Sequence, residues 1–145
     1  MSLTISEVAH QVGLKPSAIR YYEELGILPP ADRISGQRRY DNTVLYRLAV
    51  VQRARQAGFS LDEIRALFFG FHDGTPAAAR WQKLANRKLV ELNVLAEQIA
   101  SMQALLRRMK ANCHCKTLEV CGKAILEKGI SNVQRPPLPV APPRA

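Results

Sequence analysis

The fold is decided by residues 3–25, which read LTISEVAHQVGLKPSAIRYYEEL. Thr4 and Glu7 have the spacing of a helix capping box, and Gly13 interrupts the helix that they start. Pro16 suits a first helical position, so a second short helix follows after a tight turn. Two short helices joined in this way predict a helix-turn-helix, whose second helix enters the major groove of DNA.

A short hairpin is predicted after these helices. Residues 31–40 read ADRISGQRRY, and Ser35-Gly36 supplies a turn between two short arms. The returning arm carries Arg38, Arg39 and Tyr40, which offer donors for phosphates beside an aromatic ring. The hairpin therefore predicts a winged helix-turn-helix.

Three further helices are expected. One begins at Asp41 or Asn42 and runs to Ala57, and the capping-box spacing of Ser60 and Glu63 starts another. The longest helix covers residues 76–112, about 55 Å at 1.5 Å per residue. The sequence thus predicts a mainly α protein with a small β wing.

The long helix carries a coiled-coil seam, whose apolar residues alternate spacings of three and four. A helix of this length with so regular a seam predicts dimerisation, and the repeat itself allows either orientation. Lys88 falls on the same register, where it can pair, set the register or reach solvent. The predicted dimerisation residues are Leu92, Leu95, Ile99, Met102, Leu106 and Met109.

All three cysteines, Cys113, Cys115 and Cys121, follow this helix. An odd, clustered set fits metal binding or thiol redox chemistry better than a disulfide framework. His114 adds an imidazole, and thiolate and imidazole are both ligands of soft metal ions. A switch in which two cysteines form a disulfide needs no metal.

Four segments follow from these patterns: a DNA-binding domain at 1–70, a coiled-coil helix at 76–112, an effector-sensing segment at 113–133 and a Pro-rich, disordered tail at 134–145. The chain has 145 residues and a net charge of +9, which favours polyanionic partners. No apolar run suits a membrane and the N-terminus resembles no signal peptide, so we expect a cytoplasmic protein without a membrane partner. No catalytic or nucleotide-binding motif is present, so we do not expect an enzyme.

Four stretches in combination resemble the MerR family of bacterial transcriptional regulators, over about residues 3–121: LTISEVA at 3–9, AIRYYEELGI at 18–27, SGQRRY at 35–40 and AGFSLDEI at 57–64. The resemblance is closest to the SoxR-like and metal-responsive members. It implies a homodimer with two winged heads joined by an antiparallel coiled coil. It further implies an effector-dependent activator that distorts promoter DNA so that RNA polymerase can engage the promoter. Protein contacts would offset the cost of deforming the duplex.

The resemblance also implies DNA contacts. Arg20 and Tyr21 in the second helix, and Arg38 and Tyr40 in the wing, match the family's DNA-contacting residues. Of Tyr21 and Tyr22, we expect one to face DNA and the other to pack in the core. The full candidate DNA-binding set is Lys15, Ser17, Arg20, Tyr21, Arg38, Arg39 and Tyr40.

The sequence leaves several kinds of effector possible. Iron–sulfur members of the family use four cysteines, and Lys110 replaces the first of them, so a cluster is not expected. Monovalent-metal members use two cysteines eight apart, as Cys113 and Cys121 are. A divalent sensor would use all three cysteines with His114 available, and such members also take a cysteine from the partner's long helix, where this chain reads PAAAR at 76–80. We expect a thiolate-bound metal, zinc- or copper-like, ahead of redox sensing.

A different class of function is the alternative. The chain could be a coiled-coil interaction or anti-activator protein that has no effector-driven activation. Steeply salt-dependent promoter binding would favour the regulator, because phosphate contacts release counterions.

Overall fold

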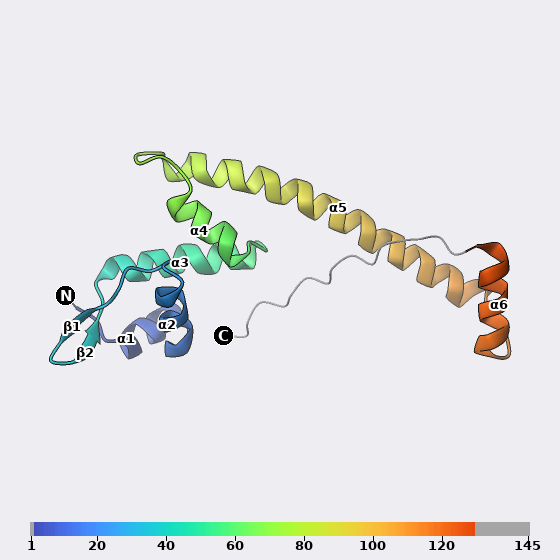
Figure 1. Ribbon diagram of the computed structural model, residues 1–145, viewed down its shortest axis with the longest axis horizontal. Coiled ribbons are helices and arrows are strands. Elements are labelled where there is room, and N and C mark those ends of the chain that lie inside the picture. Colours follow the sequence, from blue (N-terminus) through green and yellow to red (C-terminus); the bar gives the residue numbers. More distant parts are fainter. Residues whose placement is uncertain (1, 130–145) are drawn as a thin grey trace. The chain divides into compact units, whose positions relative to one another are not determined.

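The computed structural model describes residues 2–129, which form two compact units. We call residues 2–88 the head and residues 89–129 the extension. Helix α5 (Ala77–Asn112) begins in the head and continues into the extension. The fold is mainly helical with one small sheet (Figure 1), as predicted. The Pro-rich tail at 134–145 lies outside the described residues.

The helix-turn-helix consists of α1 (Ile5–Val12) and α2 (Pro16–Glu24). The Thr4 hydroxyl accepts from the backbone N–H of Glu7, and the Glu7 carboxylate accepts from the backbone N–H of Thr4 at 2.7 Å. Gly13 ends α1 with φ 68°, a left-handed conformation that favours glycine. The capping box and the turn predicted from the sequence are therefore confirmed.

The wing consists of antiparallel strands β1 (Asp32–Ile34) and β2 (Gln37–Arg39). Ser35 and Gly36 both have positive φ, 52° and 79°, as tight hairpin turns of type I′ require. Backbone hydrogen bonds between Leu3 and Tyr40, of 2.6 and 2.8 Å, tie the end of the wing to the residues before α1. The wing is thus held against the helix-turn-helix.

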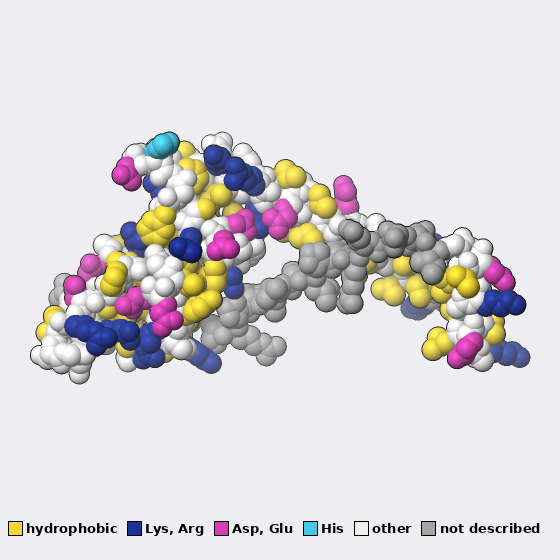
Figure 2. Space-filling model, viewed as in Figure 1, with side chains coloured by type: hydrophobic (Ala, Val, Ile, Leu, Met, Phe, Trp, Pro, Cys, Tyr) yellow, Lys and Arg dark blue, Asp and Glu magenta, His cyan; other side chains and the backbone are white. Residues whose placement is uncertain are grey.

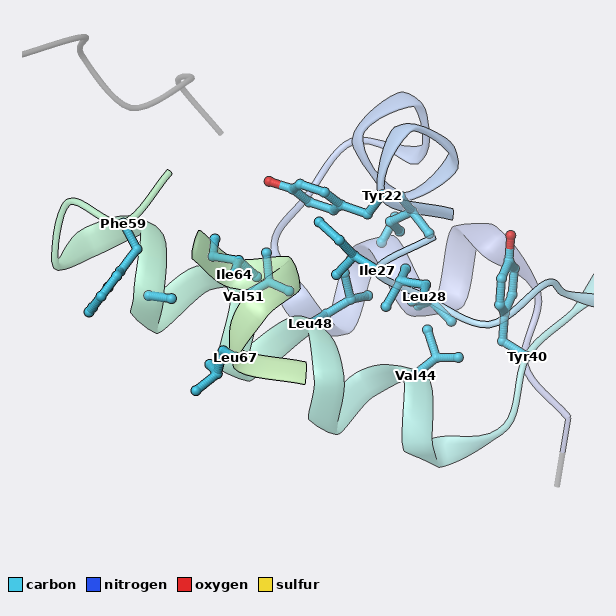
Figure 3. Close-up of a cluster of buried hydrophobic side chains, with 14 of the residues drawn as sticks. Tyr22, Ile27, Leu28, Tyr40, Val44, Leu48, Val51, Phe59, Ile64 and Leu67 are labelled. Atoms are coloured by element: carbon cyan, nitrogen blue, oxygen red, sulfur yellow. The ribbon is translucent and has the colours of Figure 1, made fainter. Parts of the chain in front are cut away.

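The core of the head joins α1, α2, α3 (Asn42–Gln56) and α4 (Leu61–Phe69), as Figure 3 shows in part. Asp41 caps α3, and Ser60 with Glu63 forms the predicted capping box of α4. Ile19, Leu48, Val51 and Ile64 are at most 1% exposed. The first turns of α5 also belong to this core, through Leu84 and Trp81.

The extension consists of the rest of α5 and a further helix, α6 (Leu118–Lys128), which the sequence analysis did not predict. Thr117 caps α6 by accepting from the backbone N–H of Val120 at 3.2 Å. A threonine before an apolar stretch was the available signal. In residues 2–129, no helix is long and apolar enough to cross a membrane.

Candidate functional site

One face of α2 carries the candidate DNA-reading residues. Ser17, Arg20 and Tyr21 recur at spacings of three and four, and all three are exposed. Ile19 and Tyr22 lie on the opposite face, in the core. Tyr21 is 49% exposed and Tyr22 only 6%, which confirms that the two tyrosines divide between surface and core. Exposed Lys15 stands just before the helix.

An open depression of about 470 Å³ lies where α2 meets the wing. Three arginines line it, Arg20 from α2, Arg33 from β1 and Arg38 from β2. Figure 2 shows Lys and Arg side chains gathered over this end of the head. The remaining lining residues are Thr4, Ile5, Ser6, Gly36 and Gln37. This basic depression can receive a phosphate backbone.

Arg33 was absent from the predicted DNA-binding set. The hairpin register pairs Arg33 with Arg38, and residues directly opposite in an antiparallel pair project from the same face. The turn at Ser35-Gly36 already implied this pairing, so the register of the predicted hairpin was the missed signal. Arg33 therefore joins the candidate set.

Glu23, on α2, connects the recognition helix to the wing. Its carboxylate accepts from the Tyr40 hydroxyl at 3.0 Å and from the backbone N–H of Ala31 at 3.1 Å. The guanidinium of Arg38 lies 4.0 Å from the same carboxylate. These contacts hold Arg38 beside α2, so Glu23 positions a candidate phosphate-binding residue.

Tyr40 differs from the other candidate DNA-binding residues in its burial. The residue is 2% exposed and belongs to the core, with its hydroxyl directed to Glu23. Burial, with the hydrogen bond to Glu23, raises the pKa of Tyr40 to about 12. The ring fills the space between the wing and the helices, so Tyr40 lies in the core, and its predicted contact with DNA stays a prediction. Arg39, half-buried, and Arg38 stay at the surface of the wing.

Lys88 lies in the head and not in an open seam. Its ammonium group donates to the Glu63 carboxylate at 2.8 Å and lies 5.4 Å from the Phe59 ring centroid. Lys88 is 5% exposed. Although burial acts to raise the pKa of Glu63, the hydrogen bonds from Lys88 and Ser60 outweigh it and lower that pKa. One carboxylate thus caps α4 and anchors α5.

Arg80 makes a second attachment of α5 to the head. Its guanidinium donates to the Leu67 and Phe68 carbonyls at 3.1 and 2.9 Å, and to the Thr75 carbonyl at 3.0 Å. These bonds satisfy carbonyls at the end of α4. Arg80 also lies over the Phe71 ring, 5.4 Å from its centroid. The α4–α5 connection is therefore held at both ends.

The three cysteines come together in the extension. Cys113 and Cys115 lie in the loop after α5, and Cys121 lies in α6. Their Sγ atoms are all within 4.8 Å of one another. Among the described residues this group contains no imidazole, so the structure does not bring His114 into the predicted metal site. Three soft sulfur donors fit a thiophilic metal ion.

The cysteine environments differ. The backbone N–H of Cys115, then the thiols of Cys115 and Cys121, donate to the Cys113 sulfur and lower the pKa of Cys113. The hydrogen bond to Cys113 is the main cause that raises the pKa of Cys115. The lowered pKa therefore favours the thiolate of Cys113, the form that binds metals, over that of Cys115.

The predicted seam residues are not buried in the single chain. Leu92, Ile99, Leu106 and Met109 are between 41% and 63% exposed, and Leu95 and Met102 are half-buried. An apolar row of this length on one helix is a surface that a partner can cover.

Comparisons with known proteins agree with this geometry. The family model described as MerR HTH family regulatory protein matches residues 3–69, and the one described as MerR, DNA binding matches residues 45–111. The uncharacterized HTH-type transcriptional regulator PA4778 of Pseudomonas aeruginosa is 38% identical over 112 residues, covering 77% of this chain and 85% of that protein.

The chain belongs to the MerR family of transcriptional regulators. A second MerR-like relative, Heavy metal-dependent transcription regulator 2 of Rhizobium meliloti, is 31% identical over 113 residues, which cover 77% of each chain. The crystal structure of the transcription regulator PbrR691 from Ralstonia metallidurans, in complex with lead(II), has a TM-score of 0.68 at 24% identity, covering 79% of this chain and 90% of that one. This likeness supports the MerR fold.

Proposed function

We propose that this MerR-family regulator binds operator DNA as a homodimer in the cytoplasm and activates transcription when a thiophilic metal ion binds its cysteines. The three mutually close sulfur atoms carry the effector part of this proposal. The name of the heavy metal-dependent relative, at 31% identity, supports the same reading.

The proposed DNA contacts come from α2 and the wing. Arg20, Arg33 and Arg38 share one depression, and Arg groups bind phosphates or guanine edges with paired donors. Tyr21, Ser17 and Lys15 are exposed beside them and supply further donors. Arg39 adds charge from the wing.

The proposed dimer forms along α5. The seam from Leu92 to Met109 leaves a row of apolar side chains that pairing of two α5 helices would cover. Family membership supports an antiparallel pairing. Two heads joined in this way would contact two half-sites and distort the DNA between them, and RNA polymerase would then engage the promoter.

The test uses an operator selected by the protein from a pool of random duplexes. We expect Arg20→Ala with Arg38→Ala to weaken binding by more than about tenfold, since each phosphate or base contact contributes about 1 kcal/mol or more. Wild-type affinity should fall steeply with salt. Gln56→Ala, on the exposed end of α3 away from the depression, is the control.

The effector is tested by transcription in vitro with RNA polymerase and added Cd²⁺, Zn²⁺ or Cu⁺. We expect transcript to rise with metal for the wild type, and not for Cys113→Ser with Cys121→Ser, which should still bind the operator. Full induction of that variant would contradict the metal site. Failure of the wild type to bind any duplex would instead favour the coiled-coil interaction protein.

A further inference from the structure

The sulfur atoms of the cysteine group all come from one chain. Cys113 follows the last turn of α5, where its backbone N–H donates to the Met109 carbonyl at 3.1 Å. Cys121 is fixed in α6, where its backbone N–H donates to the Thr117 carbonyl at 3.1 Å. The Thr117 cap and these two bonds hold the ends of the loop, and Cys115 lies between them. The group needs no residue from a second chain to bring three sulfurs together.

The three sulfurs are close enough to bind one ion together. With metal–sulfur bonds of about 2.3 Å, thiolates lie about 4.6 Å apart in a linear complex, 4.0 Å in a trigonal one and 3.8 Å in a tetrahedral one. All three Sγ pairs here are within 4.8 Å. Separations of up to 4.8 Å allow a linear pair as well as a trigonal set, so it is the nearness of a third sulfur that favours the trigonal arrangement. A trigonal ion would use all three.

The surroundings suit an anionic complex. Residues 107–123 contain five Lys or Arg and one Glu, a balance of 5 − 1 = +4. A divalent ion with three thiolates carries −1, and neighbouring cations offset that charge. Cys113 and Cys115 are exposed and Cys121 is half-buried, so an ion can reach the sulfurs from solvent.

We propose that Cys113, Cys115 and Cys121 form a complete three-thiolate site within one chain, and that Cys115 makes this site selective for soft divalent ions over monovalent ones. The inference rests on the proposed metal response and specifies its ion class. Two thiolates are enough for a linear monovalent soft ion, so we expect Cys115 to add little to its binding. A soft divalent ion gains a third bond.

The first test compares Cd²⁺ and Cu⁺ binding to the full chain, reduced and kept without oxygen, in competition with chelators. We expect the wild type to bind one Cd²⁺ per chain. Cys115→Ser should lower Cd²⁺ affinity by more than about 100-fold. That loss is larger than expected for a residue that only hydrogen-bonds to a metal ligand. The same variant should bind Cu⁺ as the wild type does. His114→Ala, in the same loop but outside the sulfur group, should change neither.

Cd²⁺ affinity within tenfold of the wild type in Cys115→Ser would overturn the inference, and so would an equal loss of Cu⁺ affinity. The ultraviolet charge-transfer absorption of the cadmium thiolates gives a second readout. It should fall by about one third per bound Cd²⁺ in Cys115→Ser, as expected when three thiolate ligands become two.

The second test asks whether one chain supplies all the ligands of the metal site. Cys113→Ser and Cys121→Ser chains are unfolded, mixed and refolded together, so that mixed dimers form. We expect no recovery of Cd²⁺ affinity, because each chain still lacks a ligand. Recovery would show a site shared between chains and would overturn the inference.

Different results would contradict the proposed function and the three-thiolate site. A wild-type chain that binds Cd²⁺ without any change in transcription would contradict the proposed function. Equal transcriptional responses to Cd²⁺ in the wild type and in Cys115→Ser would overturn only the three-thiolate site.

Discussion

The head and the extension use the same types of apolar residue in opposite ways. In the head, Ile19, Leu48 and Ile64 are at most 1% exposed. In the extension, Leu106 is 63% exposed and Leu126 70% exposed. The head therefore has a core of its own, whereas the extension carries apolar surface that its own residues do not cover. The difference agrees with the proposed dimer, in which the exposed seam of α5 is covered by a partner.

The largest effect is expected when charged residues are introduced into the seam of α5. Leu95→Glu with Ile99→Glu should dissociate the proposed dimer by more than about 10³-fold, because each unpaired polar group buried in an apolar interface costs about 2 kcal/mol or more. Analytical ultracentrifugation over a range of concentrations measures the effect. Ala104→Glu adds a negative charge at an exposed position of α5 outside the seam and should leave the dimer intact. A seam variant that stays dimeric would contradict the predicted interface.

Truncating one leucine in each unit tests the same contrast in stability. Leu48→Ala should lower the free energy of unfolding by about 2–5 kcal/mol, as buried leucines do when a cavity is left. Leu126→Ala should change it by less than about 0.5 kcal/mol, because Leu126 lies outside the proposed seam of α5 and its side chain is 70% exposed. Urea unfolding followed by circular dichroism compares them. Similar losses in the two variants would mean that the extension also has a core.

The Glu63–Lys88 pair, at the end of the head, should have an intermediate effect. Glu63→Ala should cost about 2–3 kcal/mol, less than the loss of a fully buried pair, because the Glu63 side chain is 32% exposed. Glu63→Gln keeps the capping hydrogen bond and removes only the charge, so it should cost less.

The same pair has a defined pH dependence. The pKa of Glu63 is lowered from its ordinary value of 4.5 in the folded chain, so its stabilising effect is present above 4.5 and is lost as pH falls through the lowered pKa. The advantage of the wild type over Glu63→Gln, measured by thermal unfolding, should therefore shrink below pH 4.5. An advantage that grows on acidification would contradict this pairing.

The smallest effect is expected at Tyr40. Tyr40→Phe removes the hydrogen bond to Glu23 and should lower stability by about 1 kcal/mol. Operator affinity should fall less than it does in Arg38→Ala, because the Tyr40 side chain supports the wing from the core. Paired melting and fluorescence-anisotropy measurements check this. A larger loss of affinity from Tyr40→Phe would return Tyr40 to the DNA contacts.

Local chemistry explains why most of the fold could be predicted. Thr4 with Glu7, and Ser60 with Glu63, form side chain-to-backbone contacts between residues three apart. The sequence spacing alone is therefore enough to predict each contact. The turn at Ser35-Gly36 is equally local. The helix α6 escaped prediction because it has 11 residues, an internal Gly122 and no long apolar repeat.

The missing parts of the candidate site depend on distant pairs. Tyr40 and Glu23 are 17 residues apart, and Lys88 and Glu63 are 25 apart. No sequence periodicity links residues so far apart. The sequence alone therefore suggested an exposed, DNA-facing hydroxyl for Tyr40 and a place in the coiled-coil seam for Lys88. The cysteines were predictable as a group because they are close in sequence, whereas the exclusion of His114 depends on how the loop folds.

Glu23 also limits how this regulator can be re-engineered. A designer who wants a new operator specificity would transplant residues of α2 alone, treating the recognition helix as an interchangeable module. Here the wing residues Arg38 and Tyr40 depend on a carboxylate of that same helix. A chimera must therefore exchange helix and wing together, and the two elements form one unit for design.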